Sequence, residues 1–124
     1  MRFMSLAAGL CAAFMLQSSA SAQAPSSIKI GILNDQAGPY ADFGGKTSIT
    51  AAQMAVDDFG GKVLGKPIEI VAGDHQNKPD LAASLAKRWF DVDNVDAIAD
   101  LTNSAVALAV QKIAAEKGKV VSNS

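Results

Sequence analysis

After its first 22 residues, the chain alternates between short apolar runs and longer runs with helical periodicity, and this alternation restricts the possible folds most. The runs 28–33 and 67–72 are rich in isoleucine and valine, as expected of buried strands. Glycines follow the first and third helical runs and a proline opens the second, at positions where such residues end or begin helices. The pattern predicts strands at 28–33, 67–72, 95–101 and 120–122, and helices at 47–59, 79–91 and 104–117.

Each predicted helix carries apolar side chains at intervals of three or four residues, so each has one face to bury. The segment 62–66, with a glycine inside it, is predicted to be a turn. Asn103 or Ser104 is a suitable cap for the third helix. The expected buried positions are Ile49, Ala52, Val56 and Phe59 in the first helix, Leu81, Leu85 and Trp89 in the second, and Val106, Val110 and Ile113 in the third.

Strands that alternate with helices in this way form a parallel sheet with right-handed crossovers. We therefore predict an α/β fold, a parallel sheet with helices on both faces. The last predicted strand is short and no helix follows it, which would leave part of the sheet uncovered. The expectation is that the chain is an amino-terminal fragment of a larger protein.

Residues 1–22 have the features of a cleavable leader for export. Arg2 precedes an apolar run over residues 3–16, and small residues follow up to Ala-Ser-Ala at 20–22. The single cysteine, Cys11, lies inside this run, so neither a lipid anchor nor a disulfide is expected. No second run of about 20 apolar residues is present. We expect residues 1–22 to be removed as a signal peptide and the mature protein to be soluble.

The charge balance and the motifs argue against several classes of function. Without Arg2, the 11 basic residues become 10, which against 12 acidic residues leaves a net charge of −2. That balance, with no basic cluster, does not favour nucleic acid or an anionic membrane as a partner. The chain after the first strand lacks the G-x-G-x-x-G fingerprint of dinucleotide sites. Asp74 and His75 are adjacent but lack a nucleophile, so they are interpreted as structural, and no enzyme, cofactor or metal site is predicted.

The loop at 34–46 and the segment 101–104 are the candidates for ligand binding. The first carries Tyr40 and Phe43, which form either one wall of a ligand site or a turn packed back onto the sheet. Thr102, Asn103 and Ser104 lie at the start of a helix, where backbone N–H groups and the helix dipole favour a carboxylate. The alternative is an ordinary helix cap. Hydroxyl groups at 122–124 lie at the same expected edge of the sheet, so the two segments together suit a small polar or zwitterionic molecule.

Four blocks follow one another along the chain: IKIGIL, AGPYADFGG, AAQMAVDDFGGKVLGKPIEIVAGDHQNKPDLAASLAKRW and VDAIADLTNSAVALAV. In this order they resemble the amino-terminal lobe of periplasmic binding proteins of the branched-chain amino acid (Leu/Ile/Val) type, which serve ABC transporters. The resemblance covers residues 28–124. It implies a type I periplasmic binding protein fold, with residues 23–124 as an incomplete amino-terminal lobe of a two-lobe solute-binding protein, and a periplasmic location.

The resemblance also implies a function and a set of site residues. The protein would bind a branched-chain amino acid or a related small organic or aromatic acid between two lobes and deliver it to an ABC permease of the inner membrane. Residues 23–124 alone would not bind well, because they supply half of the site. The alternative is a ligand-sensing ectodomain of a receptor or regulator that uses the same lobe. By position, the implied ligand-binding residues are Tyr40, Phe43, Thr102, Asn103, Ser104 and Ser124.

Overall fold

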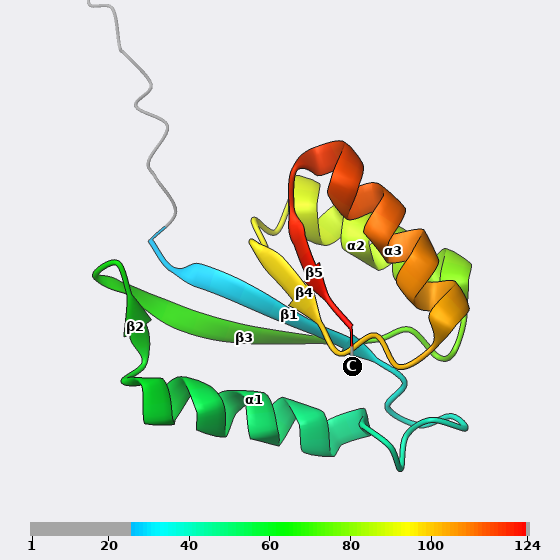
Figure 1. Cartoon of the computed structure of the whole chain (residues 1–124), viewed down its shortest axis with the longest axis horizontal. Helices are drawn as coiled ribbons and strands as arrows, with labels where there is room; N and C mark the ends of the chain where they lie inside the picture. The colour runs from blue at the N-terminus through cyan, green and yellow to red at the C-terminus, as the bar shows by residue number, and fades with distance from the viewer. Residues whose placement is uncertain (1–25, 124) are drawn as a thin grey trace, which may run out of the picture.

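The computed structural model of the chain describes residues 26–123, so the predicted signal peptide and Ser124 lie outside the described residues. Within 26–123, five strands form one sheet in the order β2-β3-β1-β4-β5 (Figure 1). The neighbouring pairs β3–β1, β1–β4 and β4–β5 are parallel, and β2 pairs with β3 in the antiparallel direction. The strands are β1 (Ile28–Asn34), β2 (Lys62–Val63), β3 (Lys66–Asp74), β4 (Ala97–Ala99) and β5 (Val120–Ser122).

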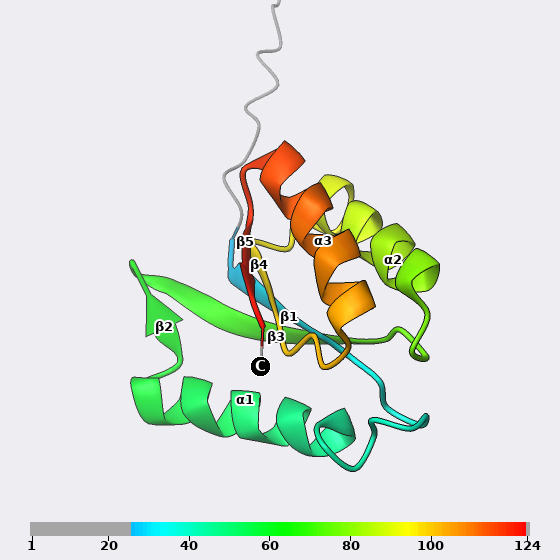
Figure 2. The same ribbon diagram turned by 45° about the vertical axis from the view of Figure 1, so that its right-hand side comes forward.

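Three helices of the described chain cover the two faces of this sheet. Helix α1 (Gly45–Phe59) lies on one face, and α2 (Pro79–Asp91) and α3 (Ser104–Lys117) lie side by side on the other (Figures 1 and 2). The predicted α/β architecture with helices on both faces is therefore confirmed. The sheet is mixed rather than purely parallel, because the short strand β2 runs against β3.

The helix ends follow the sequence signals closely. Helix α2 has the predicted bounds, with Pro79 in its first turn. Helix α3 begins at Ser104 behind an Asn103 cap and ends at Lys117, before Gly118, whose φ of 62° places it in the left-handed region that suits glycine. Helix α1 ends in the same way before Gly60, with a φ of 100°, and begins two residues earlier than predicted, at Gly45.

Strand β4 is shorter than predicted, three residues in place of the seven at 95–101. Before the strand, the Val95 N–H donates to the Trp89 carbonyl at the end of α2 and so does not extend the ladder. After the strand, Asp100 has a φ of 65°, which bends the chain out of the extended conformation. The apolar run of the sequence thus extends beyond the hydrogen-bonded strand at both ends.

Strand β2 was not predicted, although the turn that contains it was. Val63 pairs with Lys66, so Leu64 and Gly65 form a two-residue hairpin loop. Both have positive φ, 52° and 75°, which is the conformation of a type I′ turn. Leucine is unfavourable in this conformation and its side chain is 90% exposed here.

Replacing Leu64 by asparagine is therefore expected to stabilise the chain by about 1 kcal/mol, because Asn-Gly is the preferred type I′ pair. The gain is measured as a shift in the midpoint of urea unfolding. Leu64→Ala is the matched control, since it removes the exposed apolar side chain without the left-handed preference. An equal gain in both variants would contradict the backbone explanation.

The main core lies between the sheet and the helices α2 and α3. Trp89 is 7% exposed and its ring lies against Gly31 of β1 and Gly73 of β3. A Cβ atom at Gly73 would approach the ring to 2.8 Å, and one at Gly31 would overlap it, so these two strands need glycine where the indole packs.

The stripe of buried residues predicted for α3 is confirmed. In α2 the stripe is rotated, since Leu81 and Leu85 are only half-buried; the buried residues are Ala82, Ala86, Trp89 and Phe90.

The opposite face of the sheet is less well covered. Of the stripe predicted for α1, only Val56 is buried, and the prediction is wrong for Phe59, which is 66% exposed. An open apolar groove of about 350 Å³ runs between α1 and the sheet. Side chains of both elements line it, among them Ile30, Ile32, Val56, Phe59, Ile68 and Ile70.

Candidate functional site

The loops that carry the predicted site residues meet at the carboxyl edge of β1, β4 and β5. Strands β1 and β4 are neighbours, but the helices that follow them, α1 and α3, lie on opposite faces of the sheet. The two loops therefore leave the edge in opposite directions. In open α/β sheets, ligands bind in the crevice at such a switch point.

The first of these loops, residues 35–44, is organised by Asp35. This carboxylate is buried and accepts hydrogen bonds from the backbone N–H groups of Gly38, at 2.9 Å, and Tyr40, at 3.1 Å. A side chain at Gly38 would overlap the carboxylate, so the turn requires glycine there. Asp35 therefore fixes the path of the loop that carries the two aromatic residues.

Tyr40 and Phe43 form a pair at the surface of this loop. Their ring centroids are 6.4 Å apart and their planes are inclined by 50°. Phe43 is 84% exposed, so it does not pack back onto the sheet, whereas Tyr40 is half-buried. Of the two interpretations of the loop, an exposed aromatic surface agrees better with this arrangement.

Asn103 is the cap of α3. Its Oδ1 accepts from the N–H groups of Ala105, at 2.8 Å, and Val106, at 3.1 Å, and its Nδ2 donates to Asn77 Oδ1 at 2.5 Å. The capping interpretation therefore holds for this side chain, whose amide is already engaged at both ends. Any role of Asn103 toward a ligand would be to hold the turn in place.

Thr102 and Ser104, on either side of the cap, are placed differently. The Thr102 hydroxyl is buried and finds no hydrogen-bond partner among residues 26–123. Ser104 is exposed and is the first residue of α3. Gly44 of the first loop lies against Thr102, since a Cβ atom at Gly44 would be 3.2 Å from Thr102 Cγ2. Thr102 thus lies between the first loop and the start of α3.

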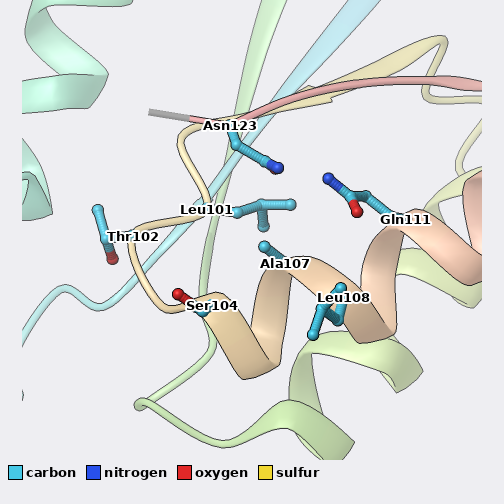
Figure 3. A pocket seen from close by; sticks show the side chains of 7 residues that line it. All are labelled: Leu101, Thr102, Ser104, Ala107, Leu108, Gln111 and Asn123. Atoms are coloured by element: carbon cyan, nitrogen blue, oxygen red, sulfur yellow. The ribbon is translucent and has the colours of Figure 1, made fainter.

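A hollow of about 290 Å³ opens beside this turn, between α3 and the end of β5 (Figure 3). In Figure 3 the amides of Asn123 and Gln111 point toward one another, and Ser104 lies at the start of the helix below them. Leu108 and Gln111 were not predicted, although they lie on the helix face of Ser104, four and seven residues after it. The lining residues are Leu101, Thr102, Ser104, Ala107, Leu108, Gln111 and Asn123.

The structure therefore brings together part of the predicted site. Thr102 and Ser104 line the hollow together with Asn123, which was predicted only as part of a polar segment. Tyr40 and Phe43 do not line it, but their loop touches Thr102 through Gly44. Ser124, the remaining predicted residue, lies outside the described residues.

Buried polar side chains at the carboxyl ends of β1 and β3 hold the loops that follow these strands. Asn34 is buried and its Nδ2 donates to the Gly45 carbonyl at 2.8 Å and to Asp100 Oδ2 at 2.7 Å, which joins the ends of β1 and β4. Asp74 Oδ1 accepts from the N–H groups of Gln36 and Gln76, in agreement with its interpretation as a loop hydrogen-bonding residue. His75, also buried, has a pKa lowered from its ordinary value of 6.5, because burial disfavours the charged imidazolium.

Among residues 26–123, no group of three or more histidine, cysteine, aspartate or glutamate side chains is arranged to hold a metal ion. No helix in the same range is both long enough and apolar enough to cross a membrane.

Comparison with known proteins places the chain among binding proteins. A family model described as periplasmic binding protein matches residues 27–124. A periplasmic binding protein from Burkholderia mallei is 53% identical, with a TM-score of 0.77 over 79% of this chain and 26% of that one. A branched-chain amino acid ABC transporter periplasmic ligand-binding protein from Burkholderia xenovorans is 45% identical, with a TM-score of 0.74 over 77% and 25%.

A third similar structure is a solute-binding protein of an ABC transporter from Rhodopseudomonas palustris in complex with 3,4-dihydroxybenzoic acid. It is 25% identical, with a TM-score of 0.72 over 80% of this chain and 27% of that one. The chain thus spans about a quarter of the length of these structures. No curated protein matched it.

Proposed function

Because this chain belongs to the periplasmic binding protein family, we propose that its protein is the solute-binding component of an ABC uptake system. Its structural relatives from B. xenovorans and R. palustris are named as a ligand-binding and a solute-binding protein of ABC transporters. On this proposal residues 1–22 are a signal peptide that directs the protein to the periplasm. Residues 23–124 form part of the amino-terminal lobe, and a second lobe completes the site.

The observation that carries the proposal is the turn at the start of α3. The Thr102 hydroxyl is buried without a partner in the described chain, and the exposed Ser104 follows within two residues. A buried hydroxyl without a partner is unfavourable unless a bound group completes its hydrogen bonding. The helix amino terminus beside it favours a negative charge. These features together favour a solute with a carboxylate.

The rest of the solute is proposed to be a compact apolar body. Tyr40 and Phe43 offer aromatic surface on the neighbouring loop, with Phe43 84% exposed. The relative from B. xenovorans is named for branched-chain amino acids, and that from R. palustris binds 3,4-dihydroxybenzoic acid. Both kinds of molecule combine a carboxylate with an apolar body. We therefore propose a branched-chain amino acid or a small aromatic acid as the solute.

Uptake also requires a partner in the membrane. The proposed cycle is that the two lobes close over the solute by a hinge motion and that the closed protein delivers it to an inner-membrane ABC permease. In this cycle the hollow beside Ser104 and Asn123 contributes one half of the enclosed site.

The proposal is tested by thermal unfolding of the full-length two-lobe protein with leucine, benzoate and 3,4-dihydroxybenzoate as probes. A ligand at 100 times its Kd stabilises the folded state by about 2.7 kcal/mol, so a true solute raises the Tm clearly. A shift with one probe supports the proposal and selects the class. No shift with any of them at millimolar concentration would contradict the proposed solute class.

Thr102→Val is expected to weaken binding of the responding probe by about 10- to 100-fold, because it removes one hydrogen bond to a charged group while keeping the shape of the side chain. Isothermal titration calorimetry measures the change in Kd. The matched control is Thr50→Val, the same substitution on the exposed side of α1. Unchanged affinity in a folded Thr102→Val protein would show that this hydroxyl does not contact the solute.

A further inference from the structure

His75 lies directly after β3 and is buried, yet its imidazole is not part of the hollow beside α3. Its backbone N–H donates to the Asn34 carbonyl at 3.0 Å, which ties it to the end of β1. Its Nδ1 accepts a hydrogen bond from the backbone N–H of Asn77, also at 3.0 Å. The imidazole thus holds the loop between β3 and α2.

A chain of hydrogen bonds continues from this loop to the candidate site. Asn77 Oδ1 accepts from Asn103 Nδ2, and Asn103 Oδ1 accepts from the first backbone N–H groups of α3. Asn77 and Asn103 are 26 positions apart in sequence. We call this chain, His75–Asn77–Asn103, the imidazole relay. It ends at the turn that carries Thr102 and Ser104.

The relay depends on the protonation state of His75. Because Nδ1 accepts the Asn77 N–H, it carries no hydrogen, and the proton of the neutral ring is on Nε2. A protonated imidazole carries hydrogens on both nitrogens. Nδ1–H would then face the Asn77 N–H, donor against donor, and this hydrogen bond would be lost.

We propose that His75 is a positioning residue, whose neutral imidazole holds the start of α3 in its solute-binding arrangement through Asn77 and Asn103, and whose protonation loosens that arrangement. The expectation that the solute binds more weakly in acid rests on the proposed function. The expectation that protonation of His75 loosens the start of α3 does not rest on it.

The charges around His75 act in opposite directions. Burial lowers its pKa and is the largest effect, whereas Asp35 after β1, Asp74 at the end of β3 and Asp100 after β4 each raise it. Because burial dominates, the pKa lies below 6.5 and the ring is neutral near pH 7. The unfolded chain takes up this proton first as the pH falls. The stability contributed by neutral His75 is therefore present above pH 6.5 and is lost progressively as the pH falls toward the folded-state pKa.

The backbone of the loop adds to this dependence. Asn77 has a φ of 57°, and Gln76 before it has a φ of 50°. Two successive residues in the left-handed region are unfavourable without contacts that hold them. The hydrogen bond to His75 Nδ1 is one of these contacts, so its loss allows the loop to relax away from Asn103.

The test is a pH titration by NMR of the full-length protein, labelled with ¹⁵N. The His75 imidazole signals are identified by their absence in His75→Asn, whose amide oxygen keeps an acceptor near Nδ1 but does not titrate. We expect a neutral ring protonated on Nε2 near pH 7, and backbone signals of Ala105 and Val106 that shift with the midpoint of His75. A ring protonated on Nδ1, or signals of α3 that do not follow His75, would overturn the proposal.

Asn77→Gly separates the relay from the general effect of a buried charge. Glycine accepts the positive φ of this position but lacks the side chain that contacts Asn103. In this variant His75 should still titrate, while the amides of Ala105 and Val106 should no longer follow it. If they follow it as before, the coupling does not pass through Asn77 and the proposal is wrong.

Solute binding supplies the second measurement, with leucine and benzoate as probes at pH values above and below the His75 midpoint that the NMR titration finds. We expect the Kd of the wild-type protein to rise about tenfold as His75 becomes protonated, and that of His75→Asn to stay constant. Binding that is constant in both proteins would overturn the link to solute release. If neither probe binds at any pH, the proposed solute class fails, while the NMR titration still decides on the relay.

Discussion

Replacing Trp89 by alanine is expected to lower the free energy of unfolding by about 3–5 kcal/mol, a large part of the 5–15 kcal/mol typical of a whole domain. The indole is 7% exposed and fills the space left by the glycines of β1 and β3. Without it, these strands and α2 would face a cavity that the backbone cannot close. Urea unfolding followed by circular dichroism measures the loss.

The glycines under the indole provide the complementary change. A Cβ atom at Gly31 would overlap the Trp89 ring, so Gly31→Ala should also destabilise the chain, by about 1–3 kcal/mol. Phe59→Ala is the matched control, because this aromatic side chain on α1 is 66% exposed. A loss from Trp89→Ala no greater than that from Phe59→Ala would mean that the indole does not organise the core.

The second large effect is expected at Asp35, in the loop 35–44 after β1. Asp35→Ala removes two hydrogen bonds to a buried carboxylate, each worth roughly 1.5–3 kcal/mol, from the N–H groups of Gly38 and Tyr40. The loop that carries Tyr40 and Phe43 would lose its fixed path. We expect a lower stability together with weaker solute binding, measured by urea unfolding and by calorimetry on the same preparations.

Asp42→Ala is the control for this change, since Asp42 is an exposed carboxylate of the same loop. It alters the net charge in the same way but removes no buried hydrogen bond, so its effect on stability should be small. Equal losses in the two variants would indicate that charge, and not the hydrogen bonds of Asp35, holds the loop.

The order of strands and helices was predictable because periodicity and end signals are local properties. Helix α2 begins at a proline and α3 ends at a glycine, and both were predicted within a residue. The length of strand β4 was overestimated, since an apolar run does not reveal that Asp100 has a positive φ. Phe59 was predicted to be buried because a helical stripe indicates which face is apolar, but not whether another element covers it.

The candidate site was predictable only in part, for a similar reason. Thr102 and Ser104 were found from their place after a predicted strand, and Asn103 as a possible cap. The role of Asp35 had a local signal, since an aspartate three residues before a glycine is typical of side chain–backbone turns. The contact of Asn77 with Asn103 joins two loops across the sheet edge and has no sequence signal.

The open groove beside α1 has a consequence for local unfolding of the chain. Helices α2 and α3 share a close-packed core with the sheet, whereas α1 buries little more than Val56. Local opening of a structure begins where few apolar contacts must be broken. Helix α1 therefore detaches from β1 and β3 at a lower free energy than the helices on the other face. The loop 35–44 is joined to α1 at Gly45, so Tyr40 and Phe43 belong to the more readily opened unit, whereas Thr102 and Ser104, at the start of α3, belong to the more rigid one.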